Sequence, residues 1–322
     1  MKKITFKFSI LFLLAFFIQS ALGQDKTIQF QFSVLDESGK FVSDLNTSDI
    51  QILQGKKTLR IDLIESKAES PLEVVIMIDS SASQEKMLPF EKKFAESIID
   101  EILIKGKDKV AIVEFSGEVL LIQDLTDNFS QAKDSLKLIE FEPPPGFIGG
   151  GIVATQTPLK SQQLAAGSTS IWNSTQEVIK AFSKVKKVDS RRVVILISDG
   201  VNTYGESKFK EVVLSSIKYQ VPIYAVGIGD DFYDGVDKKT LKKLTEQTSG
   251  ILILPVDKQN EIAKQIQTLK SGLHSAYEIT FAANLTESKD ALQEFKIEFI
   301  NPELRKKKLQ IIQPKGFISP EK

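Results

Sequence analysis

The chain has 322 residues, with 42 Lys and Arg side chains against 42 Asp and Glu, no cysteine and a single histidine. A formal charge of zero argues against a nucleic-acid-binding protein, which needs a basic excess to displace counterions from phosphates. The absence of cysteine excludes disulfide scaffolds, thiolate metal sites and cysteine nucleophiles, and His274 alone cannot build a multi-histidine zinc site, so a bound metal must have oxygen ligands.

The first 23 residues have the order of a secretory signal peptide. Three lysines lie within the first seven residues, an apolar run covers 10–18, and Ala21 and Gly23 offer small residues for cleavage. The run is too short for a comfortable membrane span, and no other stretch approaches that length. We therefore expect cleavage after Gly23 and an exported protein, either secreted or periplasmic. An uncleaved N-terminal anchor is the alternative.

Residues 24–68 alternate between apolar and polar side chains, which predicts a segment of antiparallel β-strands. Ile28, Phe30 and Phe32, for example, share one face of the first strand. Residues 276–322 return to the same period of two. Because chain termini often lie close together, we expect these two segments to join into one small accessory β module.

Between these segments, residues 69–275 carry continuous apolar runs that alternate with helical periods. The runs cover 74–78, 110–113, 193–197, 223–226 and 251–254. Strands that are apolar on both faces are typical of a parallel sheet covered by helices. The alternation predicts an α/β domain with a doubly wound, mostly parallel, Rossmann-like sheet. The long irregular segment 141–168 interrupts this pattern, and it is either a functional loop that closes over a ligand site or a surface insertion.

Two of the apolar runs end in an aspartate followed by turn residues, at Asp79 and Asp199. Residues just past the carboxyl ends of such strands line the ligand crevice, so both carboxylates should face the same edge. Ser81 and Ser83 add hydroxyls at alternate positions, and the segment 167–170 offers a third. A helix cap would need only one of these side chains. Two carboxylates with three hydroxyls form a hard oxygen shell, which suits Mg²⁺ or Mn²⁺ and is less selective for Ca²⁺.

The sequence Asp-Ser-Ser-Ala-Ser at 79–83 resembles the D-x-S-x-S signature of von Willebrand factor type A domains. Thr169, before a predicted helix, is similar to the threonine of that family, and Asp199 with Gly200 is similar to its later aspartate. Together these residues look like a complete metal-ion-dependent adhesion site (MIDAS). The N-terminal β segment and the ending 313–317 also resemble a bacterial secreted "VWFA-related" family.

The resemblance implies a set of metal ligands, of which the last two bind the ion directly or through water: Asp79, Ser81, Ser83, Thr169 and Asp199. It also implies an open coordination position, which an Asp or Glu carboxylate of a protein partner fills. We therefore expect a non-enzymatic, metal-dependent binding or adhesion module without a membrane segment after cleavage. The identity of the partner and the oligomeric state stay open.

Two alternatives remain at this stage. The first is a hydrolase or phosphotransferase that uses the same ion as a Lewis acid. Against it, no histidine lies near these residues in the sequence, and Ser81 stands where a D-x-D phosphatase signature has its second carboxylate. The second is a scaffold whose β module binds the partner while the metal is structural.

Overall fold

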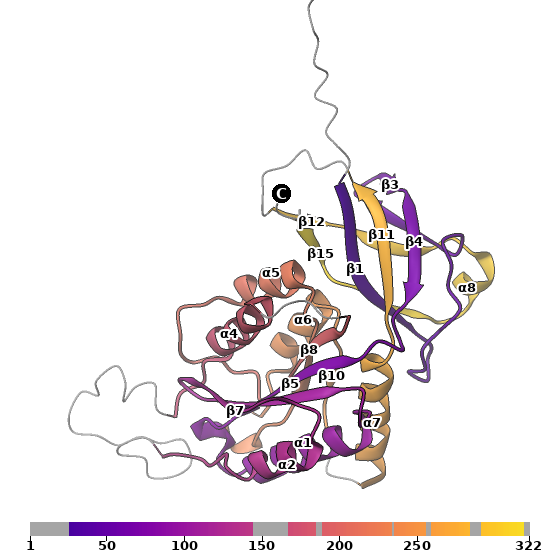
Figure 1. Ribbon diagram of the computed structural model, residues 1–322. Helices are drawn as coiled ribbons and strands as arrows, with labels where there is room; N and C mark the ends of the chain where they lie inside the picture. The colour runs from indigo at the N-terminus through magenta and orange to yellow at the C-terminus, as the bar shows by residue number, and fades with distance from the viewer. Residues whose placement is uncertain are drawn as a thin grey trace, which may run out of the picture.

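The computed structural model describes residues 26–143, 167–184, 189–233, 235–255, 259–283 and 291–318. The predicted signal segment and most of the segment 141–168 lie outside these residues. Figure 1 shows a layered α/β part with a smaller β part beside it. Among the helices described, none combines the length and apolar character that a membrane crossing requires.

A six-stranded sheet forms the centre of the α/β part, in the order β10-β9-β8-β5-β6-β7. Five strands are parallel, and β7 pairs antiparallel with β6. The strands are β5 (Leu72–Asp79), β6 (Lys109–Phe115), β7 (Val119–Thr126), β8 (Arg191–Ser198), β9 (Ile223–Gly227) and β10 (Leu252–Ile253). Every residue of β5 is buried, as expected for a central parallel strand. The predicted fold class is confirmed.

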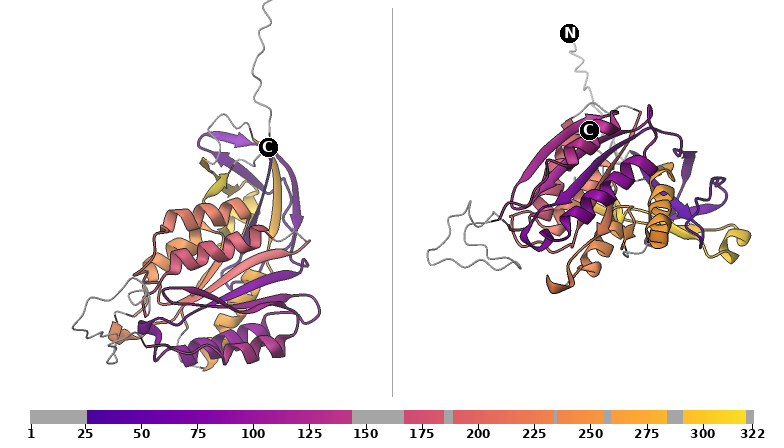
Figure 2. Two further views of the ribbon diagram at one scale, coloured as in Figure 1. Left: turned by 60° about the vertical axis from the view of Figure 1, so that its left-hand side comes forward. Right: turned by 90° about the horizontal axis from the view of Figure 1, so that it is seen from below.

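Helices cover both faces of this sheet, so that three layers are visible edge-on in Figure 2. Alternate residues of β5 divide between the two cores: Val74, Ile76 and Ile78 face one set of helices, and Val75 and Met77 face the other. The first set is α1 (Leu88–Glu101), α2 (Phe129–Leu136) and α7 (Gln259–Leu273). The second set is α4 (Ile171–Lys184), α5 (Phe209–Tyr219) and α6 (Lys238–Gln247).

The N-terminal and C-terminal segments pair with each other, which confirms the predicted accessory β module. In its main sheet, of order β14-β1-β11-β4, β1 runs antiparallel to β11 from Lys26 opposite Ala283 to Phe32 opposite Tyr277. These strands are β1 (Lys26–Leu35), β4 (Ile61–Ser66), β11 (Tyr277–Ala283) and β14 (Gln310–Ile312). The smaller pairings use β2 (Ile50–Gln54), β3 (Lys57–Leu59), β12 (Leu292–Glu294), β13 (Lys296–Phe299) and β15 (Gly316–Ile318), with the short helix α8 (Pro302–Lys306) between β13 and β14.

The β module lies at the amino ends of the central strands. Arg191, the first residue of β8, donates hydrogen bonds to the Gln31 side chain at 3.1 Å and to the Leu273 carbonyl at 2.7 Å. The carboxyl ends of the same strands point away from the module (Figure 1). The edge of the sheet that holds the predicted site is therefore not covered by the β module.

Candidate metal centre

Asp79 and Asp199 meet at the carboxyl ends of two neighbouring strands. Asp79 is the last residue of β5, and Asp199 follows the last residue of β8. The parallel register pairs Ile78 with Ile197, which brings the two strand ends side by side. The Ser198 hydroxyl donates a 2.6 Å hydrogen bond to Asp79 Oδ2, and both carboxylates are buried. The fold thus joins two acids that are 120 positions apart in the sequence.

The loop after β5 turns tightly enough to direct its hydroxyls toward these acids. The Ser81 amide donates to Asp79 Oδ1 at 3.0 Å, so the aspartate side chain closes the first turn. The Ser81 and Ser83 hydroxyl oxygens lie 3.3 Å apart. The Ser83 hydroxyl then donates to Asp199 Oδ2 at 2.7 Å. Four of the five predicted site residues are therefore linked in one hydrogen-bonded chain.

Thr169, the fifth predicted residue, lies in a segment that contacts both loops. The Gly167 carbonyl accepts a hydrogen bond from the Ala82 amide at 3.0 Å, which ties the segment to the loop after β5. The Thr169 amide donates to Thr203 Oγ1 at 2.9 Å, and its carbonyl accepts from the Thr203 and Tyr204 amides. Thr169 is buried. These contacts place it between the loop after β5 and the loop after β8.

The protonation behaviour of the two aspartates reflects their burial. Burial, together with the charge of Asp199, raises the pKa of Asp79 to about 7, against hydrogen bonds from Ser198 and Ser81 that lower it. Burial also raises the pKa of Asp199, while the hydrogen bond from Ser83 lowers it. A nearby positive charge would lower the pKa of both aspartates, because it favours the ionised carboxylates.

The donor set fits a hard divalent cation. Among the described residues, no three acidic or histidine side chains converge closely enough to hold a metal by themselves, so any cation here depends on the serine and threonine hydroxyls. Beside the site, Gln84 and Glu91 are buried, and none of their side-chain polar atoms has a hydrogen-bond partner in the described chain. Buried polar atoms are nearly always satisfied by protein, water or an ion. These polar atoms are therefore available to bind the waters of a hydrated Mg²⁺ or Mn²⁺ ion.

Sequence reasoning did not identify Ser198, Gln84 or Glu91 as residues of this region. Each had a signal: Ser198 is a polar residue at the end of an otherwise apolar run. Glu91 precedes Phe94 and Ala95 by three and four positions, so it falls on the apolar face of α1. An acid on such a face either reaches solvent or has a buried partner, and the sequence does not distinguish these cases.

Apolar side chains lie at the rim of the site. Val201, two residues after Asp199, is 37% exposed, and Phe232 in the short helix η2 (Asp231–Tyr233) is 68% exposed. Lys86 connects this rim to the loop after β5, because its ammonium lies 3.6 Å from Asp230 Oδ2 and 5.3 Å from the centre of the Phe232 ring. Aromatic side chains are enriched at protein–protein interfaces, so a surface with an exposed aromatic ring is well suited to binding another protein.

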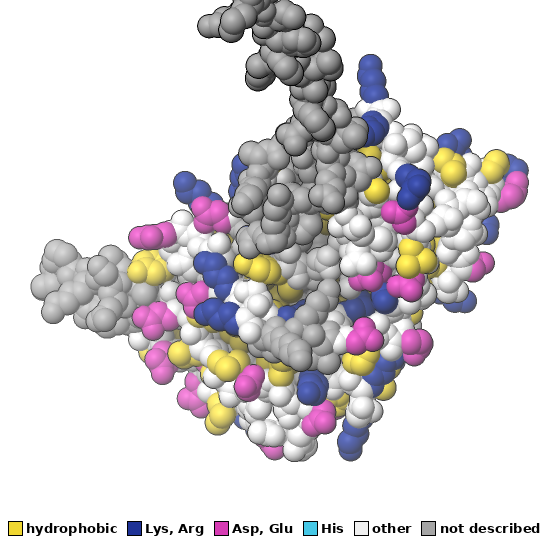
Figure 3. All heavy atoms as spheres, turned by 45° about the horizontal axis from the view of Figure 1, so that its top comes forward, with side chains coloured by type: hydrophobic (Ala, Val, Ile, Leu, Met, Phe, Trp, Pro, Cys, Tyr) yellow, Lys and Arg dark blue, Asp and Glu magenta, His cyan; other side chains and the backbone are white. Residues whose placement is uncertain are grey.

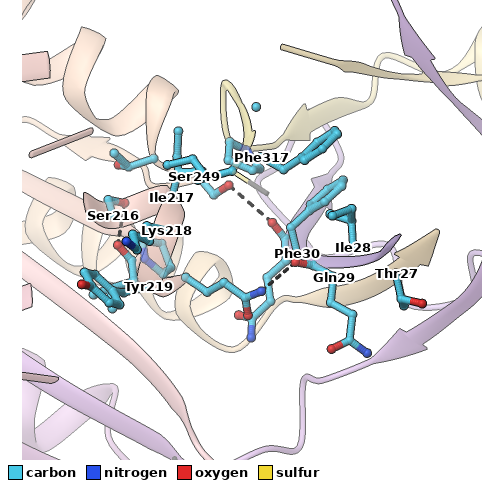
Figure 4. Close-up of a pocket in the computed structure, with 18 residues that line it drawn as sticks. Thr27, Ile28, Gln29, Phe30, Ser216, Ile217, Lys218, Tyr219, Ser249 and Phe317 are labelled. Atoms are coloured by element: carbon cyan, nitrogen blue, oxygen red, sulfur yellow. Dashed lines mark hydrogen bonds between the residues drawn. The ribbon is translucent and has the colours of Figure 1, made fainter. Parts of the chain in front are cut away.

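A separate cavity of about 380 Å³ lies at the other edge of the sheet, between α5 and β1 (Figure 4). Gln220 donates a 2.6 Å hydrogen bond across it to the Gln29 carbonyl, and Ser249 donates at 3.4 Å to the Gln31 carbonyl. Among the described residues that line it, none is acidic and Lys218 alone is charged. The described lining of this cavity therefore offers no carboxylate to a cation.

The surface carries both signs of charge. On the face shown in Figure 3, Lys and Arg side chains are interspersed with Asp and Glu side chains. Among the described residues on that face, no broad patch of one sign is visible. This distribution agrees with the zero formal charge and gives no support to a nucleic-acid partner.

The family model of the von Willebrand factor type A domain matches residues 73–269, which include all five candidate ligands. A search of curated proteins found no match. Among solved structures, the chain is similar to the conserved hypothetical protein BatB from Bacteroides thetaiotaomicron (15% identity, TM-score 0.45, covering 64% of this chain and 100% of that chain).

Two further solved structures are similar at comparable levels. One is an aerotolerance-related membrane protein from Bacteroides fragilis (17% identity, TM-score 0.44, covering 62% of this chain and 98% of that chain). The other is proximal thread matrix protein 1 from the mussel byssus, described with a zinc-occupied MIDAS motif (17% identity, TM-score 0.46, covering 69% of this chain and 49% of that chain).

Proposed function

This protein belongs to the von Willebrand factor type A domain family, and from that premise we propose that it is a metal-dependent protein-binding module. Its cation would be held by the five residues that the loops bring together: Asp79, Ser81, Ser83, Thr169 and Asp199. The observation that carries the proposal is the hydrogen-bonded convergence of two buried aspartates and two serines at the carboxyl ends of β5 and β8.

The charge balance of the site supports the binding of an acidic partner. Asp79 and Asp199 contribute two negative charges, which neutralise a divalent ion without an excess, while the hydroxyl ligands are neutral. Mg²⁺ usually keeps several waters in proteins, and a partner's carboxylate can replace one of them. A bound cation would here supply electrostatic attraction for an Asp or Glu of the partner. Val201 and Phe232 at the rim would contact apolar side chains beside that acid.

We propose binding and not catalysis for this centre. The single histidine of the chain, His274, follows α7, and its Nε2 lies 3.0 Å from the Ile102 carbonyl. It neighbours Arg191, which begins β8, so it is on the opposite edge of the sheet from Asp79. A hydrolase at this centre would lack a histidine base. Turnover of an ester or phosphate with Mn²⁺ that disappears in Asp79→Ala would favour the enzymatic alternative.

The direct test compares metal and partner binding in one set of variants. We expect Mg²⁺ or Mn²⁺ to raise the melting temperature of the wild-type protein and EDTA to reverse the effect. Asp79→Ala should lose both this shift and the capture of a partner from the envelope fraction of the source cells. Asp124→Ala, which alters an exposed acid on the edge strand β7, is the matched control.

Two outcomes would contradict the proposal. No metal-dependent shift in the wild-type protein at millimolar Mg²⁺ and Mn²⁺ would argue against an occupied site. Partner binding that persists in EDTA and in Asp79→Ala would transfer the binding function to the β module and make any metal structural.

We also propose that the protein is exported after cleavage at Gly23, with domain boundaries at 24–68, 69–275 and 276–322. The proposal rests on the order of charges, apolar run and small residues in the first 23 positions. N-terminal sequencing of the mature protein from source cells tests it, and Gln24 is the expected first residue. A mature protein that keeps Met1 and sediments with membranes would indicate an uncleaved anchor.

A further inference from the structure

Gln84 and Glu91 are unusual among the buried residues of this protein. Gln84 ends the short helix η1 (Ala82–Gln84) in the loop after β5, and Glu91 lies in the first turn of α1. Both side chains are fully buried. Seven buried side-chain polar atoms in the described part of the chain have no hydrogen-bond partner, and four of them belong to these two residues. The unsatisfied polarity is therefore concentrated in one place.

A carboxyl at position 91 is costly for the fold itself. Glu91 occupies a core-facing position of α1, together with Phe94, Ala95 and Ile98, where an apolar side chain would pack without penalty. A buried polar group without a partner costs on the order of 1–3 kcal/mol, and more when it is charged. The helix N-terminus favours a negative charge there but offsets a part of this cost. The residue therefore requires a role other than packing.

Both side chains belong to the surroundings of the metal centre. Gln84 follows Ser83 directly, and its polar side chain is close enough to lower the pKa of Asp199, although the two side chains form no hydrogen bond of normal geometry. Burial raises the pKa of Glu91 well above its usual range, and the charges of Asp79 and Asp199 raise it further. The carboxyl of Glu91 thus lies within electrostatic reach of both aspartates, on the core side of the site.

We propose that Glu91 and Gln84 form the inner wall of the metal centre, where they bind the waters that a Mg²⁺ or Mn²⁺ ion retains and so raise its affinity. The inference rests on the proposed function of this site. Glu91 is placed outside the direct ligand set because no three acidic side chains of the described chain converge closely enough for that. Groups that hold the ligands of a metal typically change its affinity 10–100-fold.

The experiment measures Mg²⁺ and Mn²⁺ binding by titration calorimetry, together with the melting temperature in EDTA. The variants are Glu91→Gln, which keeps the shape without the charge, and Gln84→Met, which keeps the length without hydrogen bonding. Glu101→Gln, the same change at the exposed end of α1, is the matched control. We expect a dissociation constant raised at least tenfold in both test variants and unchanged in the control. Without metal, Glu91→Gln should melt at or above the wild-type temperature.

Each outcome decides a different statement. If the wild-type protein binds Mg²⁺ and both test variants bind it with the same affinity, the inference is wrong and the proposed metal centre stands. If the wild-type protein binds neither ion, both proposals fail. If Glu91→Gln does not fold, the affinity of Gln84→Met decides. A metal-free melting temperature of Glu91→Gln well below the wild-type value, with an unchanged Mg²⁺ affinity, would show a structural role for Glu91 and overturn the inference.

Discussion

Ser83 donates a 2.7 Å hydrogen bond to Asp199 across 116 positions of the sequence. This single contact joins the loop after β5 to the loop after β8, above strands that are already paired in register. A hydroxyl that donates its proton to a carboxylate keeps its lone pairs, so the same oxygen can also bind a cation. The arrangement without metal is therefore compatible with the arrangement proposed for the metal-bound site.

Ser83→Ala should weaken metal binding more than it weakens the fold. The substitution removes one proposed ligand and the hydrogen bond to Asp199, and a hydrogen bond to a charged group contributes about 1.5–3 kcal/mol. We expect the Mg²⁺-induced rise in melting temperature to fall strongly in calorimetric scans. Ser97→Ala, which removes a hydroxyl bonded to the Lys93 carbonyl on α1, is the control and should leave the rise intact. An equal loss in both variants would contradict the assignment of Ser83.

The metal-free protein should lose stability as pH rises through the range set by Asp79. Its pKa is about 7 in the folded protein against an ordinary value of 3.8, so the folded state binds the proton more tightly than the unfolded state. Stability from this group is thus present at low pH and is lost between pH 4 and 7, by up to about 4 kcal/mol. The raised pKa values of Asp199 and Glu91 act in the same direction.

Other carboxylates have lowered pKa values and act in the opposite direction. The effect of Asp79 is therefore measured as the difference in stability between the wild-type protein and a variant that lacks this acid. The free energy of unfolding of wild-type protein and Asp79→Asn is compared in urea with EDTA from pH 4 to 7.5. The wild-type protein should lose stability relative to the variant as pH rises, and saturating Mg²⁺ should remove that loss. A wild-type protein that gains stability relative to Asp79→Asn over this range would contradict the raised pKa.

The central strands were predictable because strands that are buried on both faces have continuous apolar sequences, such as 74–78 and 193–197. The strand β7 was not predicted. It is the antiparallel edge strand, and Leu120 and Leu121 on it are exposed, so its sequence follows neither a buried run nor a clean alternation. Edge strands have fewer neighbours to impose a pattern on them, and their sequences therefore give a weaker signal.

The positions of the candidate site residues could be predicted from the sequence with different kinds of argument. The closeness of Asp79 and Asp199 follows from physics alone, because the carboxyl ends of parallel strands lie along one edge of the sheet. Thr169 has no such argument, since it lies in a loop whose path depends on tertiary contacts with Ala82 and Thr203, and the family resemblance identified it. Glu91 was passed over although it lies on the apolar face of α1. Whether a long acidic side chain on such a face reaches solvent depends on the packing of the neighbouring elements.

The β module should contribute to stability without contributing to metal binding. Four aromatic rings from distant segments meet in its core: Phe30, Phe281, Phe295 and Phe317, with the centroids of Phe30 and Phe295 only 4.3 Å apart. Phe281→Ala should cost about 3–5 kcal/mol in urea unfolding, as for other buried phenylalanines. Leu63→Ala, on the exposed face of β4, is the control. If folded Phe281→Ala binds Mg²⁺ with an affinity different from that of the wild-type protein, the β module contributes to metal binding and the prediction is wrong.

Phe232 should determine partner affinity while leaving the metal site unchanged. Its ring is 68% exposed beside the centre, and the Lys86 ammonium that contacts it is also near Asp230. A few residues near the centre of an interface typically dominate its affinity, and truncating such a residue to alanine costs about 2 kcal/mol or more. Phe232→Ala should therefore weaken binding to a partner captured through Mg²⁺ by about tenfold or more, measured by surface plasmon resonance at saturating Mg²⁺. The same variant should bind Mg²⁺ with the wild-type affinity in calorimetry.

Leu120→Ala is the control. It alters another exposed apolar residue, on the edge strand β7, and should have no effect on either measurement. If Leu120→Ala lowers the affinity for the partner and Phe232→Ala does not, the partner binds at the edge strand β7. The carboxylate of the partner then does not reach the cation from the side of Phe232.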